Sequence, residues 1–195
     1  MKPYSEKEIL QKLSDGDKKA FEFLYDTYQL RLYHFAFHYL NDEEVSKDIV
    51  QDVFSFVWTD RKKLEVVSNL SSWLYTLTKN QCLKKIDHLK VKQKHVDILK
   101  YRQLNVVQNA LTELDTSPMI FDEINMIVNQ ILSGLPPQSR QIFEMSRFDN
   151  LKNREIAEKL DISQKSVEAH ITKALKNFRE ALKNYLPLVA FLFLE

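Results

Sequence analysis

Residues 155–175 read EIAEKLDISQKSVEAHITKAL, and this stretch predicts two helices joined by a tight turn. Ile156 and Ala157 give the first helix an apolar side, and the small Ala157 allows close helix crossing. Ile162 lies in the turn as a buried contact, and Ser163 can cap the second helix. The second helix has apolar residues at three- and four-residue steps, which form an inward face: Val167, Ile171, Ala174, Leu175 and Phe178. The pattern predicts a helix-turn-helix.

The outer face of the second helix carries side chains that suit DNA. In a helix-turn-helix, the first turns of the second helix enter the major groove. Ser, His and Lys can bond base edges or phosphates, Ala can touch a thymine methyl, and Glu can accept from cytosine. The candidate DNA-contacting residues are Lys165, Ser166, Glu168, Ala169, His170 and Lys173. The plainer alternative is a helical hairpin with a solvated face.

Charge is distributed unevenly along the chain. The motif itself is slightly negative, although DNA affinity comes largely from cations that neutralise phosphates. Residues 59–102 hold eleven Lys and Arg against four Asp and Glu, a net charge of +7. Residues 1–58 have a net charge of −4 and residues 103–195 one of −2. The basic segment is a candidate nucleic-acid footprint, with a solvated helix face as the alternative.

Composition favours an all-α fold. The 195 residues include only two Gly, Gly16 and Gly134, too few and too isolated for a β-rich fold or a phosphate-binding loop. The single cysteine, Cys82, excludes an intramolecular disulfide and fits a reducing compartment. The longest apolar run, residues 186–194, is too short to span a bilayer. We expect a soluble cytoplasmic protein whose apolar end packs on the second domain or meets a partner.

Caps and periodicity predict the individual helices. Ser5 and Glu8 form a capping box, Asp17 can cap the next helix, and Pro118 suits a first helical turn. The expected helices cover a short segment from residue 5, then 18–40, 43–59, 71–90, 119–132, 137–148 and the motif, with a polar loop at 60–69. The pattern weakens after residue 94. We therefore predict two helical domains, 1–94 and 119–195, joined by a linker at 95–118.

Two parts of the chain resemble sigma factors of the extracytoplasmic-function (ECF) type. Their second conserved region is similar to GDKKAFEFLYDTYQLRLYHFAFHYL, DEEVSKDIVQDVFSFVW and SSWLYTLTKNQCLKKIDHLK. Their fourth region is similar to LPPQSRQIFEMSRFDNLKNREIA and the motif that follows it. SQKSVEAHI also looks like LuxR-type regulators, but those usually carry a sheet-based sensing domain, and residues 1–94 show no βα alternation. The resemblance covers residues 5–94 and 119–183.

The resemblance implies a sigma factor that binds core RNA polymerase and directs promoter-specific initiation, without a catalytic site, metal or cofactor. The first domain is then expected to recognise and melt the −10 element, and the second to read the −35 element. The core-polymerase-binding candidates form a polar stripe beside the apolar face of the third helix: Asp48, Gln51, Asp52 and Ser55. The −10 candidates are Ser68, Asn69, Lys79, Asn80, Lys84 and Lys85. Trp73 is a further candidate, although its position on an apolar face favours the core.

The family also suggests an anti-sigma factor as a partner, and no stable homo-oligomer is expected. Lys152 stands where the family often has a capping Ser or Thr, so Asn153 is the expected cap. Glu168 and His170 occupy positions where basic residues are common.

Two alternatives belong to other classes. The first is a LuxR-type regulator that binds operator DNA as a dimer without polymerase. The second is a metal-dependent helical hydrolase that uses His34 and His38, which lie four residues apart on one helix. No third ligand is nearby, so these histidines are better read as partly buried ring side chains.

Overall fold

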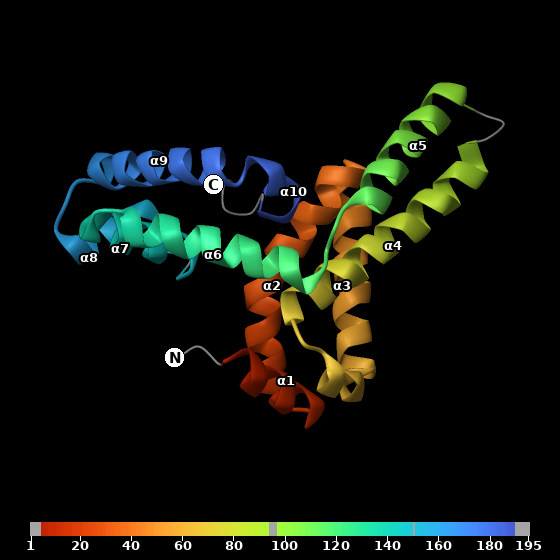
Figure 1. The fold of residues 1–195 in the computed structure, drawn as a ribbon, viewed down its shortest axis with the longest axis horizontal. Coiled ribbons are helices and arrows are strands. Elements are labelled where there is room, and N and C mark those ends of the chain that lie inside the picture. The colour runs from red at the N-terminus through yellow and green to blue at the C-terminus, as the bar shows by residue number, and fades with distance from the viewer. Residues whose placement is uncertain (1–4, 94–96, 150, 190–195) are drawn as a thin grey trace. The chain divides into compact units, whose positions relative to one another are not determined.

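The computed structural model describes residues 5–93, 97–149 and 151–189, and within these ranges the regular structure is entirely helical. The chain divides into two compact units, unit 1 (Met1–Phe121) and unit 2 (Asp122–Glu195) (Figure 1). The prediction of an all-α fold with two helical parts is confirmed. Among the helices of the described ranges, none is both long and apolar enough to cross a lipid bilayer.

Unit 1 begins with capped helices, as the sequence predicts. The Ser5 and Glu8 capping box starts the first helix. Asp17 accepts from the backbone of Lys19 and Ala20, and Asp42 accepts from Val45. These local contacts stabilise the helix starts without help from tertiary packing. The elements of unit 1 are α1 (Glu6–Ser14), α2 (Lys18–Leu40), α3 (Glu43–Thr59), the 3-10 helix η1 (Arg61–Val66), α4 (Leu70–Gln93) and α5 (Ile98–Glu113), and α6 (Pro118–Gly134) starts at its end.

The core of unit 1 lies among α2, α3 and α4. Leu32, Val57, Leu74 and Cys82 have no exposed surface. The apolar periodicity of α3 predicts an inward face of Val45, Ile49, Val53 and Phe56. The buried face is wider, because Val50, Phe54 and Val57 join Ile49 and Val53 there, whereas Val45 and Phe56 are only half-buried. Helix α3 thus packs against both α2 and α4, and its opposite side faces solvent.

Helix α5 occupies most of the segment that the sequence predicts to be a linker. It pairs with α4 (Figure 1) through polar contacts: Lys90 donates to Gln108 Oε1, and Gln108 donates to Asp87 Oδ1 at 2.7 Å. Leu111 is the apolar residue that α5 buries fully. Tyr101, Leu104 and Val107 of α5 are half-buried at three- and four-residue steps before Leu111. The predicted linker is therefore largely helical, and this helix combines an apolar side with the polar pairs.

Unit 2 contains the helix-turn-helix and the helices that support it. The rings of Phe143 and Phe178 stack with centroids 4.6 Å apart, and both are fully buried. Tyr185 donates a side-chain hydrogen bond to Glu123, which raises the pKa of the tyrosine. The end of the described chain is also packed, because Leu188 and Val189 are buried. The elements after α6 are α7 (Pro137–Arg147), α8 (Asn153–Leu160), α9 (Gln164–Ala181), η2 (Lys183–Tyr185) and α10 (Leu186–Val189).

Candidate nucleic-acid and protein-binding surfaces

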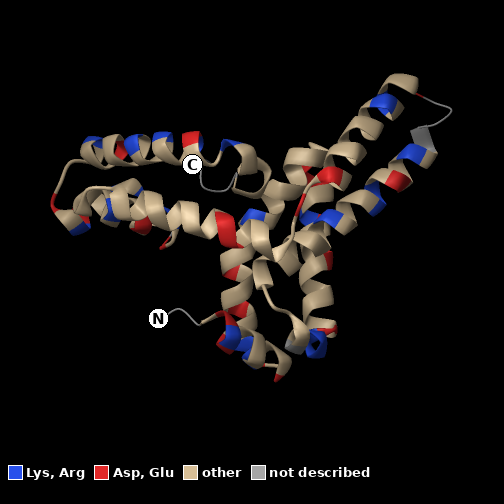
Figure 2. Cartoon of the chain, in the orientation of Figure 1, with Lys and Arg blue, Asp and Glu red and all other residues tan. Residues whose placement is uncertain are grey.

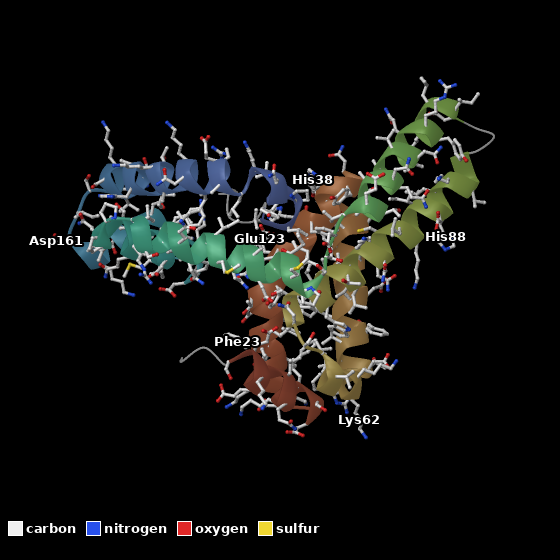
Figure 3. The ribbon with its side chains drawn as sticks, viewed as in Figure 1. Phe23, His38, Lys62, His88, Glu123 and Asp161 are labelled. Carbon is white, nitrogen blue, oxygen red and sulfur yellow. The ribbon has the colours of Figure 1, made fainter. Side chains whose placement is uncertain are left out.

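The turn between α8 and α9 has the geometry that the sequence predicts. Helix α8 ends at Asp161, which is labelled in Figure 3 and has a left-handed backbone with φ of 51°. Asp tolerates this conformation better than most residues. Ile162 is half-buried in the turn. Ser163 Oγ accepts from Ser166 N at 3.1 Å and caps α9, so the predicted start of this helix is confirmed.

The inward and outward faces of α9 are also as expected. The inward face is buried at Val167, Ile171, Ala174, Leu175 and Phe178. On the outward face, Lys165, Glu168, Ala169 and Lys173 are exposed, whereas Ser166 and His170 are half-buried. Figure 2 colours both basic and acidic residues along this helix. The six candidate contacts include two Lys and one Glu. The outward face is thus accessible but close to neutral.

His170 has a structural contact that the sequence did not indicate. Its Nδ1 lies 2.8 Å from Ser139 Oγ on α7, and Ser139 is 4% exposed. The two residues are 31 positions apart, so no local pattern could have joined them. Only the other ring nitrogen, Nε2, remains to meet a base or phosphate, and the pair fixes the orientation of the imidazole.

The start of α8 differs from the expected cap. Lys152, not Asn153, occupies the N-cap position, and Asn153 is the first helical residue. Lysine has no acceptor atom, so its side chain cannot cap. The carboxylate of Glu155 instead accepts from Lys152 N at 2.7 Å. Glu155, the third residue of α8, thus satisfies the backbone N–H of the N-cap residue. This is one half of a capping box, formed here without a Ser or Thr at the N-cap.

The predicted polar stripe on α3 is exposed along its whole length, at Asp48, Gln51, Asp52 and Ser55. Asp48 and Asp52 form no hydrogen bond or ion pair with any residue that the structure describes. Their carboxylates are therefore available for a partner's donors.

Beside this stripe, α2 and α3 enclose an open groove of about 870 Å³. Gln51 and Ser55 line both the stripe and the groove. The floor is aromatic: the Tyr25 and Phe54 rings have centroids 4.8 Å apart, and Tyr25 is 39% exposed. Leu30, also in the lining, is 56% exposed. Sequence reasoning identified the stripe but missed the groove, whose signal was the surplus of aromatic residues in α2.

The segment that enters α4 is more ordered than the predicted polar loop. Residues 61–66 form η1, and its Leu64 is fully buried. Ser68 is exposed, but Asn69 is half-buried and its Oδ1 accepts from Ser72 N at 2.8 Å. Asn69 thus caps the first turn of α4. Trp73 is half-buried, with its ring 6.3 Å from that of Phe56, which agrees with a packing role.

The remaining −10 candidates on α4 separate into two groups. Asn80 and Lys84 are exposed and Lys85 is half-buried, and Figure 2 colours the basic residues along this helix blue. Lys79 instead donates to the backbone oxygen of Leu114 at 2.6 Å, just after α5. The sequence places Lys79 and Lys84 in one basic run, whereas the structure brings Lys79 to the end of α5.

No group of three or more His, Cys, Asp or Glu side chains that could hold a metal occurs in the described part of the chain. Burial lowers the pKa of His34, which favours its neutral form. Burial also raises the pKa of the Cys82 thiol to about 12. A thiol with so high a pKa is a poor nucleophile.

Comparison with known proteins identifies the family. Residues 24–92 match Sigma-70 region 2, and residues 125–178 match Sigma-70, region 4. The chain belongs to the sigma-70 family and is a sigma factor of the ECF type, which directs promoter-specific transcription with core RNA polymerase. The predicted family is confirmed, and a LuxR-type regulator is not favoured.

Several sigma factors are similar over almost their whole length. The ECF RNA polymerase sigma factor SigW of Bacillus subtilis is 23% identical, with 91% of this chain and 97% of that protein covered. The ECF RNA polymerase sigma-E factor of Haemophilus influenzae is 25% identical, with 90% and 92% covered. A solved structure described as "Structure of CnrH in complex with the cytosolic domain of CnrY" matches at 18% identity and a TM-score of 0.35, with 91% and 96% covered.

Proposed function

We propose that core RNA polymerase docks on the α2–α3 side of unit 1, through Asp48, Gln51, Asp52, Ser55 and the adjoining groove. The observation that carries this proposal is the shared edge: Gln51 and Ser55 belong to both the stripe and the groove. Protein interfaces combine an apolar centre with a polar rim. Here the aromatic floor provides the centre and the exposed carboxylates provide the rim. Carboxylates form strong, directional pairs with Arg, which suits a reversible docking surface.

We also propose that the −10 element is recognised by the loop before α4 and by the open face of that helix. Ser68, Asn80, Lys84 and Lys85 are the favoured contacts, since the first two are exposed polar groups and the lysines can meet phosphates. Asn69 and Lys79 remain candidates, but each already has a structural partner. Lys79 could reach DNA only after it leaves the end of α5.

In unit 2, the outward face of α9 is proposed to read the −35 element through Lys165, Ser166, Glu168, Ala169, His170 and Lys173. The capped start of α9 places these residues in its first three turns, the part that enters the major groove in a helix-turn-helix. The fixed ring of His170 favours a directed contact through Nε2.

The remaining functional assignments follow from the family. We propose a cytoplasmic, non-catalytic protein that works without cofactor or stable self-association. Residues 1–94 and 119–195 are proposed to act as its −10 and −35 domains, with α5 accompanying the first. An anti-sigma factor is proposed as a further partner, because the family to which the chain belongs suggests one.

Reconstitution tests this function. The full chain is added to core polymerase, and transcripts are measured from promoters with intact, −10-altered and −35-altered elements. We expect transcripts that depend on both elements. Failure to bind core polymerase would overturn the proposed docking, and tight, specific DNA binding by the free protein as a dimer would favour a regulator instead.

A further inference from the structure

Helix α1 lies outside the matched Sigma-70 region 2 segment of residues 24–92, yet it packs against η1, just before the −10 loop. Its apolar side is buried at Ile9 and Leu13, and Leu64 of η1 is also fully buried. At the end of α1, a side chain at Gly16 would meet Arg61 of η1, since a Cβ built there lies 3.5 Å from Arg61 Nε. Helix α1 is therefore a support for the segment that leads into α4.

A single side chain of α1 reaches α4 itself. Glu6 accepts, through Oε1, a hydrogen bond from the backbone nitrogen of Leu70, the first residue of α4. The first backbone N–H groups of a helix have no partner within the helix. A carboxylate at this end also interacts favourably with the helix dipole. The bond spans 64 residues and so fixes where α4 begins relative to α1.

Two more contacts hold the same turn. The Tyr28 hydroxyl of α2 lies 2.7 Å from Ser71 Oγ, and Asn69 accepts from Ser72 N at 2.8 Å. Three consecutive residues at the start of α4 are thus held by α1, by α2 and by the chain's own cap. Before this turn, Val66 at the end of η1 is 88% exposed and Ser68 is exposed, whereas Val67 and Asn69 are half-buried.

We propose that Glu6 is a positioning residue for −10 recognition. It holds the first turn of α4 in place and with it the preceding segment at residues 66–69, so that this segment is already ordered before DNA arrives. This inference rests on the proposed role of that loop and of α4. Extruding a base from the duplex is costly, and a loop that is already ordered loses less conformational freedom on binding.

The test compares Glu6→Ala, Glu6→Gln and Glu8→Ala in the full chain with core polymerase. Promoter opening is followed by the fluorescence of 2-aminopurine in the −10 element, and core affinity is measured in parallel. We expect Glu6→Ala to slow opening about five- to tenfold, the scale of the net contribution of one typical intramolecular hydrogen bond, with unchanged core affinity. Glu6→Gln keeps an acceptor and should restore most of the rate.

Glu8→Ala is the matched control, since it removes the same charge from the same helix and breaks only the capping box with Ser5. We expect it to open promoters at the wild-type rate. Equal slowing by Glu8→Ala and Glu6→Ala would overturn the inference, because general weakening of α1 would then explain both. Wild-type opening by Glu6→Ala would overturn it directly.

Two further variants complete the test. Tyr28→Phe removes only the hydroxyl that meets Ser71 and should slow opening even if Glu6→Ala folds poorly; a wild-type rate in Tyr28→Phe would then count against the positioning role. Lys84→Ala tests the proposed −10 surface itself. If Lys84→Ala slows opening and Glu6→Ala does not, only the positioning role fails. If Lys84→Ala has no effect, the proposed −10 surface fails, and the positioning role fails with it.

Discussion

Replacing Asp52 by Arg should separate core binding from folding. Asp52 is exposed in the middle of α3 and forms no hydrogen bond or ion pair with the described residues. Substitutions at such surface positions usually change the free energy of unfolding by no more than about 0.5 kcal/mol. We therefore expect the Asp52→Arg variant to keep its helical content and its thermal unfolding midpoint.

The effect on docking should be much larger. A new Arg would face the basic groups that Asp52 is proposed to meet, and juxtaposed like charges at an interface cost several kcal/mol. A loss of about 2–5 kcal/mol corresponds to roughly a 30- to 4000-fold rise in the Kd for core polymerase. Part of this rise should appear as a slower association that depends on salt, since exposed charges act over a Debye length of about 8–10 Å.

Fluorescence anisotropy of labelled protein titrated with core polymerase measures this Kd. Glu113→Arg is the control, because it makes the same change of charge at an exposed position on α5, away from the proposed docking surface. We expect Glu113→Arg to bind like the wild type. Wild-type affinity in Asp52→Arg, or equal weakening in both variants, would refute docking through this stripe. Unfolding of Asp52→Arg would show that its exposure has been misjudged.

Three other predictions concern unit 2 and the core of unit 1. Phe178→Ala removes one of two stacked buried rings and should lower the free energy of unfolding by about 3–5 kcal/mol in chemical denaturation, with loss of −35-dependent transcription; a change below about 1 kcal/mol would contradict the packing described. His170→Ala leaves the buried Ser139 hydroxyl without its partner and should lower the free energy of unfolding by about 1–3 kcal/mol. The double variant with Ser139→Ala should lose less than the sum of the two single variants. Strict additivity of the two losses would exclude the contact. Burial raises the pKa of the Cys82 thiol to about 12, so the folded state binds the thiol proton more tightly than the unfolded state. The contribution of this group to the free energy of unfolding should therefore fall as pH rises above about 8.5, the usual pKa of a thiol. Mass spectrometry after iodoacetamide treatment at about pH 8, just below that thiol value, should find Cys82 unmodified in the native protein and modified in denaturant.

Local signals were sufficient to predict most helices. Asp17, Asp42 and Ser163 each cap a helix through contacts two or three residues away, so their effect can be read from sequence spacing alone. The outward face of α9 followed from its apolar periodicity in the same way. The exposure of the α3 stripe was also predictable. The stripe lies about a quarter turn round the helix from the apolar face, and such a position is exposed to solvent unless another element covers it.

Contacts between distant segments were not predictable. Helix α5 is held to α4 partly by polar pairs such as Gln108 with Asp87, which are 21 residues apart and which no local pattern can join. The same reason hid the partners of Lys79 and His170, which come from other helices. The groove between α2 and α3 likewise depends on how two aromatic faces meet. Sequence thus located the candidate surfaces but not which of their side chains are already occupied.

These occupied side chains bear on how a near-neutral helix-turn-helix can act on DNA. Lys165 and Lys173 are the only cations among the six proposed −35 contacts, and Glu168 lies between them on the exposed face of α9. Part of the basic segment at residues 59–102 is also committed: Lys79 and Lys90 hold α5, and Lys63 pairs with Asp60 at 2.7 Å. Affinity for DNA rises with the number of phosphates neutralised, so a recognition face with two Lys against one Glu is expected to bind DNA weakly on its own. When polymerase holds the chain on the promoter, however, the second contact becomes intramolecular, and its effective concentration can reach the millimolar range. The weak charge of α9 then favours specificity. A helix-turn-helix held on DNA by polymerase gains little affinity from phosphate attraction, so its base contacts decide which sequence it binds.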